Sequence, residues 1–126
     1  MNKEVINTQD APAPIGPYSQ AVKAANLLFI SGQIALVPGS GELISTSIAD
    51  ETQQVMKNLE SILQEAGASF NSVVKTTIFL SDMALFAEVN EVYGSYFTGD
   101  FPARETVAVK GLPKSVNVEI SMIAAI

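Results

Sequence analysis

The last eleven residues, 116–126, set the strongest limit on the fold of this chain. They begin as Val-Asn-Val-Glu-Ile-Ser, with the alternation of apolar and polar side chains that is typical of a strand with one buried face. The alternation then stops, because Ile123, Ala125 and Ile126 make the end of the strand apolar on both faces. The fold therefore has to cover two sides of the sheet to which this strand belongs.

The rest of the chain supplies two helices. Apolar side chains recur with the helical period over residues 49–66 and again over 83–97. Ser47 and Asp50 resemble a capping box before the first helix, and Gly67 is a natural stop after it. Two helices of this length can cover one face of a sheet.

Further strands are predicted at residues 27–34, 73–80 and 106–109. Gly32 interrupts the first of these, which indicates a β-bulge or a close approach of backbone to another group. The order of elements favours an α+β fold in which a mixed β-sheet carries two helices on one face. We expect a single domain over residues 1–126.

The second sheet face remains apolar and uncovered in this arrangement. A monomer would expose that surface, whereas a closed symmetric oligomer would bury it. We therefore expect the free sheet faces of several subunits to pack together around an axis. The pattern by itself does not fix the number of subunits.

Composition narrows the chemistry. The chain has neither cysteine nor histidine, which excludes a thiolate nucleophile, a Ser-His-Asp triad and most zinc sites. We expect no metal and no cofactor. The net charge of −6 argues against nucleic acid as a partner, and no apolar run is long enough for a membrane span. No signal-peptide pattern opens the chain, so a cytoplasmic protein is predicted.

Arg104 and Glu119 are the first candidate site residues. Arg104 is the only arginine, and its guanidinium group matches a carboxylate in a bidentate geometry. A surface arginine paired with an acid is an equally good interpretation. Glu119 lies mid-strand between Val118 and Ile120, where it is partly buried if both faces are covered and exposed if one face is open.

Tyr18 and Asn90 are weaker candidates. Tyr18 follows Gly16-Pro17 in a proline-rich segment, and it either stacks on a planar substrate or pins the loop to the core. Asn90 is a polar residue within the second predicted helix. Its amide either holds a loop or reaches a ligand, and the structural role is the main interpretation.

Four separated parts of the chain, in order, resemble the motifs of the RidA/YjgF family. They are Ile15–Ala21, Ser31–Ile34, Val89–Tyr93 and the C-terminal signature formed by Phe101–Arg104, Gly111–Lys114 and Val116–Ile120. The resemblance implies a homotrimer with a chorismate-mutase-like fold, in which three sheets form a central β-barrel and active sites lie between subunits. It also implies hydrolysis of 2-iminobutanoate and 2-iminopropanoate to 2-oxo acids and ammonia, which protects pyridoxal-phosphate enzymes.

The resemblance also assigns roles to individual residues. Arg104 matches the arginine that binds the substrate carboxylate, Glu119 the glutamate that positions water, and Tyr18 a tyrosine that contacts substrate. Gly32 matches a backbone contact to substrate. Thr106 stands where some members have cysteine, so a thiol step is excluded while its backbone amide remains a ligand contact.

Asn90 matches a family asparagine that we interpret as mainly structural, and it is kept as a candidate substrate-binding residue. Glu105 departs from the family, in which the residue after the arginine is often small. Because neighbouring strand residues point to opposite faces, we expect Glu105 to avoid the site.

Three other functions compete with imine hydrolysis. The same trimer fits a non-catalytic binder or sensor of small carboxylates such as 2-oxo acids, because Arg104 would serve it equally. A ribonuclease or translation inhibitor disagrees with the acidic composition. A chorismate mutase has a dianionic substrate that favours several cationic groups, and the chain has one arginine.

Overall fold

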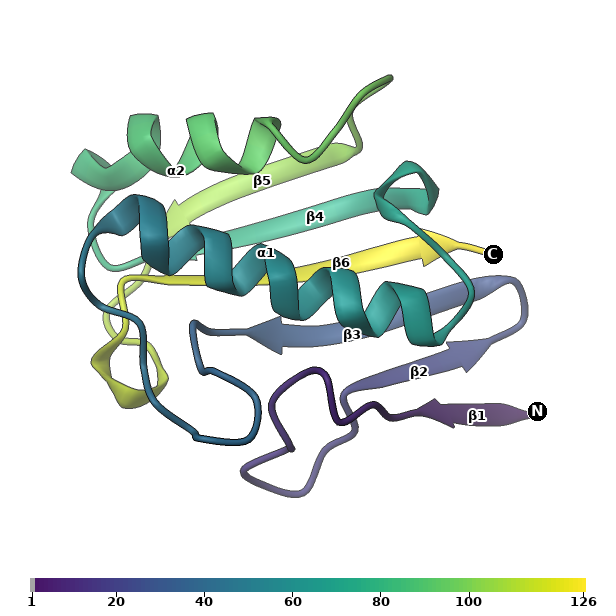
Figure 1. The fold of residues 1–126 in the computed structure, drawn as a ribbon. Coiled ribbons are helices and arrows are strands. Elements are labelled where there is room, and N and C mark those ends of the chain that lie inside the picture. The colour runs from purple at the N-terminus through teal and green to yellow at the C-terminus, as the bar shows by residue number, and fades with distance from the viewer. Residues whose placement is uncertain (1) are drawn as a thin grey trace.

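A computed structural model describes residues 2–126 (Figure 1). Its centre is one six-stranded sheet with the strand order β1-β2-β3-β6-β4-β5. Neighbouring strands are antiparallel except β4 and β5, which are parallel, so the predicted mixed sheet is confirmed. The strands are β1 (Lys3–Ile6), β2 (Ala21–Ala24), β3 (Leu27–Gln33), β4 (Val73–Leu80), β5 (Ala103–Ala108) and β6 (Val118–Ala125).

Two α-helices cover one face of this sheet, α1 (Ile48–Glu65) and α2 (Phe86–Gly94) (Figure 1). The apolar side of α1 is buried against the inward-facing residues of β3, β4 and β6, which form the main core. The Ser47 hydroxyl accepts the N–H of Asp50 at 3.0 Å, so the predicted cap is present. The second bond of a capping box takes a different form here: the Asp50 carboxylate accepts a hydrogen bond from the Thr46 hydroxyl. Gly67 has φ of +75°, as a C-terminal stop requires.

The second helix is shorter than the sequence predicts. Residues Met83–Leu85 form a 3₁₀ turn, in which the Asp82 carboxylate accepts the N–H of Ala84. After Gly94 the chain continues in i→i+3 turns, with the N–H of Phe97 donating to the carbonyl of Gly94. Apolar spacing persists through both tight turns, which is why periodicity alone extends the helix to 83–97.

Strands β1 and β2 are missing from the sequence prediction. Each is only four residues long, and neither shows a regular alternation of apolar and polar side chains. They complete the sheet on the side of β3 by antiparallel pairing, in which Val5 lies opposite Val22 and Val22 lies opposite Phe29.

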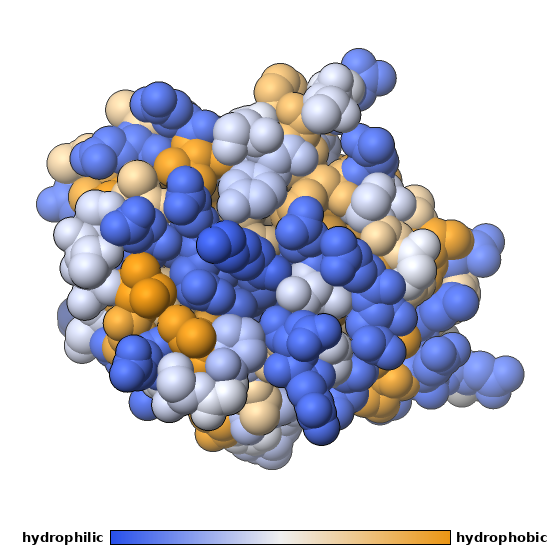
Figure 2. All heavy atoms as spheres, in the orientation of Figure 1, coloured by the Kyte–Doolittle hydropathy of each residue, from blue (hydrophilic) through white to orange (hydrophobic). Residues whose placement is uncertain are grey.

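The sheet face away from the helices is open and partly apolar. A row of paired residues crosses it from Val5 through Val22 and Phe29 to Ile123. Phe29 is 42% exposed and Val5 is 54% exposed. The helix side, by contrast, presents a mostly hydrophilic surface with scattered apolar spots (Figure 2). The uncovered face expected from the sequence is therefore present in the single chain, whereas the trimer and its barrel stay predictions.

No helix among residues 2–126 combines the length and the apolar character needed to cross a membrane.

Two buried amides fasten irregular segments to the core. Gln20, which is 1% exposed, donates through Nε2 to the carbonyls of Thr8 and Pro12 at 3.0 and 2.9 Å. Asn58 on α1 donates through Nδ2 to the carbonyls of Ile34 and Leu36 at 3.0 and 2.9 Å. The Ile34 carbonyl also accepts the N–H of Leu36, and Leu36 forms an isolated bridge with Leu43, so the Asn58 amide adds to the few backbone contacts of this irregular segment.

We predict that Asn58→Ala lowers the free energy of unfolding by about 1–3 kcal/mol, because the Leu36 carbonyl loses its side-chain donor while the Ile34 carbonyl keeps the N–H of Leu36. Gln54→Ala is the matched control: Gln54 donates only to the Asn58 side chain and should cost less than about 1 kcal/mol. Urea denaturation at equal protein concentrations measures both variants. An equal loss in the two variants would contradict the assignment.

Candidate functional site

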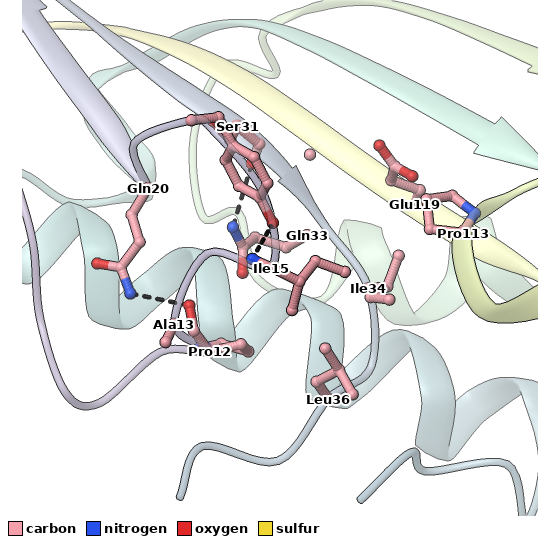
Figure 3. Close-up of a pocket in the computed structure, with 12 residues that line it drawn as sticks. Pro12, Ala13, Ile15, Gln20, Ser31, Gln33, Ile34, Leu36, Pro113 and Glu119 are labelled. Carbon is pink, nitrogen blue, oxygen red and sulfur yellow. Dashed lines mark hydrogen bonds between the residues drawn. The ribbon is translucent and has the colours of Figure 1, made fainter. Parts of the chain in front are cut away.

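Glu119 projects from β6 on the open side of the sheet. Its neighbours Val118 and Ile120 are fully buried under the helices, so strand alternation turns Glu119 to the opposite face. There it borders a surface cavity of about 320 Å³. Figure 3 shows the carboxylate turned towards this cavity. The other lining residues are Pro12, Ala13, Ile15, Tyr18, Gln20, Ser31, Gly32, Gln33, Ile34, Leu36 and Pro113.

Gly32 brings the backbone of β3 against the Glu119 side chain. The pairing of β3 with β6 shifts register between Ile30 and Gln33, which is the irregularity that the glycine predicts. A Cβ atom at position 32 would lie only 2.9 Å from Cδ of Glu119. The close approach predicted at Gly32 is therefore confirmed, and the strand pairing is irregular at the same place.

The Glu119 carboxylate accepts no hydrogen bond from the side chains or backbone of residues 2–126. Burial raises the pKa of Glu119 above its usual value of 4.5, because the ionised form loses hydration. A partly buried carboxylate of this kind, free of partners and beside a cavity, is suited to orient water or take a proton from it.

Tyr18 and the proline-rich loop form the opposite wall of this cavity. The Tyr18 hydroxyl accepts the N–H of Ile15 at 3.2 Å, so it stabilises its own loop. The residue as a whole remains 46% exposed. Ile15, Ile34 and Pro113 make much of the wall apolar, which limits the hydration of anything bound there. Tyr18, Gly32 and Glu119, which come from three segments of the sequence, thus line one cavity.

Arg104 lies elsewhere in the chain. On β5 it pairs with Thr76, which is buried beneath the helices, so its side chain is on the helix side of the sheet. Glu119 pairs with Phe79 on the opposite face. Arg104 borders a separate surface cavity of about 340 Å³, lined also by Asn90, Tyr93, Gly94, Phe101 and Pro102.

Two aromatic rings of α2 hold the Arg104 side chain. Its Cζ lies 5.2 Å from the ring centroid of Tyr93 and 5.6 Å from that of Phe86, within the range of cation–π contacts. Tyr93 is itself fixed, since its hydroxyl donates to Thr76 Oγ1 at 3.0 Å, and burial raises its pKa. No carboxylate in residues 2–126 forms an ion pair with Arg104, so its charge remains available for an anion.

Sequence reasoning missed this pair of rings, because Phe86 and Tyr93 fit an ordinary apolar helix face. The spacing of seven residues that puts them on one side of α2 was the available signal.

Asn90 and Thr106 belong to the same side of the sheet as Arg104. The half-buried Asn90 amide makes no hydrogen bond within residues 2–126, so the loop-holding role gains no support. Thr106 Oγ1 is buried and likewise unpaired within those residues. The direction of the Thr106 N–H follows from its distance to Val109 in the chain. The N–H of Val109 donates to the carbonyl of Leu80 on β4. Backbone N–H groups point alternately to the two sides of a strand, and Thr106 lies three residues earlier, so its N–H points to the open edge of β5.

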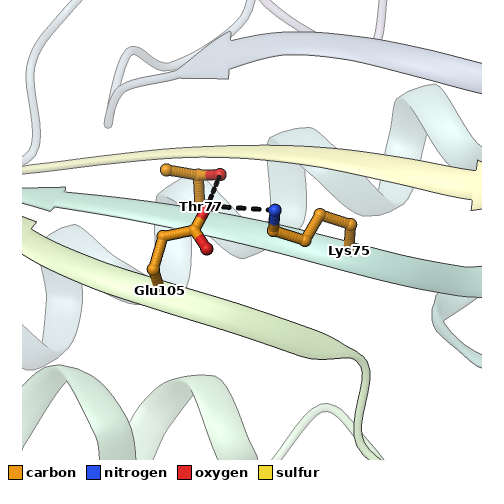
Figure 4. A network of polar contacts seen from close by, with 3 residues as sticks. All are labelled: Lys75, Thr77 and Glu105. Carbon is orange, nitrogen blue, oxygen red and sulfur yellow. Dashed lines mark hydrogen bonds and ion pairs between the residues drawn. The ribbon is translucent and has the colours of Figure 1, made fainter.

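Glu105 points away from Arg104 and lies on the sheet face that carries Glu119. Its carboxylate lies 3.0 Å from Lys75 Nζ and accepts from the Thr77 hydroxyl at 3.4 Å (Figure 4). All three residues share the open sheet face. Glu105 is therefore engaged in an ion pair on the face opposite to the arginine side chain.

The candidate residues thus form two sets. The first set is the poorly hydrated Glu119 carboxylate, which borders a cavity together with Tyr18 and Gly32. The second set is the Arg104 guanidinium group, which lies near Asn90 and the open edge of β5. No cluster of three potential metal-binding side chains occurs in residues 2–126. Within one chain the two sets do not meet, because they lie on opposite faces of the sheet.

This fold and these two sets of residues define a class of small α+β proteins with helices on one sheet face and an open second face. The family model described as Endoribonuclease L-PSP matches residues 8–126. The chain belongs to this family, the RidA/YjgF family.

Curated relatives and solved structures resemble the chain along nearly its whole length. A mouse protein named 2-iminobutanoate/2-iminopropanoate deaminase is 50% identical over 122 residues, covering 97% of this chain and 90% of the relative. An Arabidopsis thaliana protein named Reactive Intermediate Deaminase A, chloroplastic, is 50% identical, covering all of this chain and 67% of the relative. The structure of E. coli TdcF with bound serine has a TM-score of 0.93 at 38% identity, covering 98% of each chain.

We predict that Glu119→Gln is more stable than the wild type at neutral pH. An acid whose pKa is raised by folding favours the fold while protonated, and that contribution is lost as the pH rises through the folded pKa. The variant removes the penalty of the ionised form, so its melting temperature should exceed the wild-type value at about pH 7.5 and match it at about pH 4. Glu42→Gln, in an exposed loop, should show no such pH-dependent gain.

Proposed function

We propose that the protein is a hydrolytic deaminase that converts 2-iminobutanoate and 2-iminopropanoate to 2-oxo acids and ammonia. The observation that carries this proposal is the Glu119 carboxylate, which borders a cavity without a hydrogen-bond partner and with its pKa raised by burial. The names of relatives about half identical to the chain support the same reaction.

The chemistry needs two functions from the protein. Arg104 binds the substrate carboxylate, and the protonated imine is already electrophilic at C2. Glu119 accepts a proton from a water molecule whose oxygen forms the new bond to C2. Protonated Glu119 then gives its proton to the nitrogen of the carbinolamine, and the C–N bond breaks to release ammonia. The C2 oxygen becomes the carbonyl of the 2-oxo acid as its hydroxyl proton passes to the Glu119 carboxylate and on to solvent. Positioning supplies most of the rate enhancement, and the scheme uses no cofactor.

Both functions act on one substrate only if two subunits share the site. We propose a homotrimer in which the open sheet faces pack around the axis as a central β-barrel. Arg104 of one subunit then faces the cavity with Tyr18, Gly32 and Glu119 of its neighbour. The exposed apolar row on the open face supports this assembly, and so does the separation of the two sets in the single chain.

The remaining candidates have supporting roles in this proposal. Tyr18 is half-exposed and contacts the substrate, and Gly32 lets the Glu119 carboxylate lie against the backbone of β3, which itself contacts the substrate. Thr106 contributes its edge-facing N–H, and Asn90 lies beside Arg104 near the substrate. Removal of imines before they react with pyridoxal-phosphate enzymes is the physiological role that fits such an activity. A cytoplasmic location stays a prediction, since the Arabidopsis relative is named chloroplastic.

A non-catalytic binder of small carboxylates is the second candidate. The E. coli TdcF structure holds serine, which shows that a related protein accepts a small amino acid. A coupled assay separates the two candidates: threonine dehydratase generates the imine, and formation of 2-oxobutanoate and ammonia is timed with and without the protein. Acceleration supports the deaminase, and binding of 2-oxobutanoate without acceleration supports the binder.

Substitutions of Arg104 and of Glu119 should change different kinetic constants. Arg104→Ala should raise KM strongly, and Arg104→Lys should not restore it fully, because an ammonium group lacks the planar geometry. Glu119→Gln should lower turnover by about 10²-fold or more while 2-oxobutanoate still binds in calorimetric titration. Loss of that binding in Glu119→Gln, together with its retention in Arg104→Ala, would reverse the two roles.

Mixed oligomers test the shared site. Arg104→Ala and Glu119→Gln subunits, dissociated together and reassembled in equal amounts, should recover about one quarter of wild-type activity, since each site draws its two halves from different subunits at random. Each variant treated alone is the control. Sedimentation should give a trimer. A stable monomer, or no recovery in verified mixed trimers, would contradict the shared site.

A further inference from the structure

We propose that Glu51 is a positioning residue for Glu119, acting through the start of β6. This inference rests on the proposed function, because it concerns how the general base is held. Glu51 lies in the first turn of α1 and is 2% exposed. It is on the helix side of the sheet, opposite the Glu119 carboxylate, so the two carboxylates do not act on the same molecule.

The Glu51 carboxylate accepts three hydrogen bonds from the segment that leads into β6. Oε2 accepts the backbone N–H of Asn117 at 2.8 Å and that of Val118 at 3.1 Å. Oε1 accepts the Asn117 side-chain amide at 3.1 Å. No lysine or arginine in residues 2–126 forms an ion pair with it, so these N–H groups provide its only strong partners. Hydrogen bonds to an ionised acceptor are among the stronger ones in proteins.

Asn117 extends this connection to β4. Its side-chain Oδ1 accepts the Ser81 hydroxyl at 2.9 Å, and its backbone carbonyl accepts the Ser81 N–H at 2.9 Å. Ser81 directly follows the last residue of β4. The network therefore joins the beginning of α1, the end of β4 and the beginning of β6 at one end of the sheet.

Glu119 depends on this network more than an ordinary side chain would. It lies one residue after Val118, and its own carboxylate has no hydrogen bond within residues 2–126. Its position is set by the backbone of β6 and by contact with Gly32, where a Cβ atom would displace the carboxylate. A displacement of about 1 Å in a reacting group can cost about 10²-fold in rate. Loosening the start of β6 should therefore reduce turnover before it affects substrate binding.

The experiment compares Glu51→Ala with Glu51→Gln and with the control Thr52→Ala. Thr52 is the next residue of α1 and is also fully buried, but its hydroxyl donates to the carbonyl of Ile48 within the helix. In Glu51→Gln the amide oxygen still accepts the two backbone N–H groups. A reversed Asn117 amide then accepts from the glutamine and donates to Ser81, so this variant should rescue the contact.

Initial rates of 2-oxobutanoate formation give kcat and KM, and thermal melts verify folding. We expect Glu51→Ala to lower kcat by about tenfold or more with KM within about threefold of wild type. Glu51→Gln and Thr52→Ala should keep kcat within about threefold. Wild-type kcat in folded Glu51→Ala, or an equal loss in Thr52→Ala, overturns the positioning role.

If Glu51→Ala does not fold, Asn117→Ala decides the question, because it removes the side-chain bonds and keeps the two backbone bonds to Glu51. It should lower kcat by about threefold or more, and an unchanged kcat overturns the proposal. The two proposals fail in different ways. If the wild-type protein releases no ammonia from the imine, the proposed function is contradicted. If the wild type and Glu51→Ala are equally active, only the positioning role is contradicted.

Discussion

The packing of α1 across β3 and β6 is the interaction on which the rest of the structure depends. Its apolar side buries the main core. Its polar residues reach out from the same buried side: Asn58 holds the carbonyls of Ile34 and Leu36, and Glu51 holds the first N–H groups of β6. One helix therefore stabilises the fold and also fixes the segment after β3 and the start of β6, which lie on either side of the Glu119 cavity.

Much of the fold could be predicted from sequence because its long elements have clear periods. The eight-residue β4 lies at its predicted bounds, and α1 differs by one residue at each end. β1 and β2 escaped detection because four residues are too few to establish a period. The helix prediction over 83–97 was too long, because tight turns on both sides of α2 preserve the apolar spacing.

The candidate site was predictable in its residues and not in its arrangement. Gly32 inside an apolar strand indicated a close approach, and the structure identifies Glu119 as the group approached. Arg104 has no acidic partner and contacts Phe86 and Tyr93 because of the way α2 lies on β5. A local sequence pattern does not predict how a helix is placed on a strand. The division of the site between two sheet faces follows from strand parity, yet it becomes visible only when the order of strands is known.

The contact between Gly32 and Glu119 links two positions that are far apart in the sequence. Any side chain at position 32 would occupy space that the Glu119 carboxylate fills. Such a substitution becomes compatible with this backbone only when residue 119 is shortened or turned away. Among descendants of this chain, a side chain at position 32 should therefore be accompanied by a shorter residue at 119 or by a glutamate whose carboxylate has left its present place.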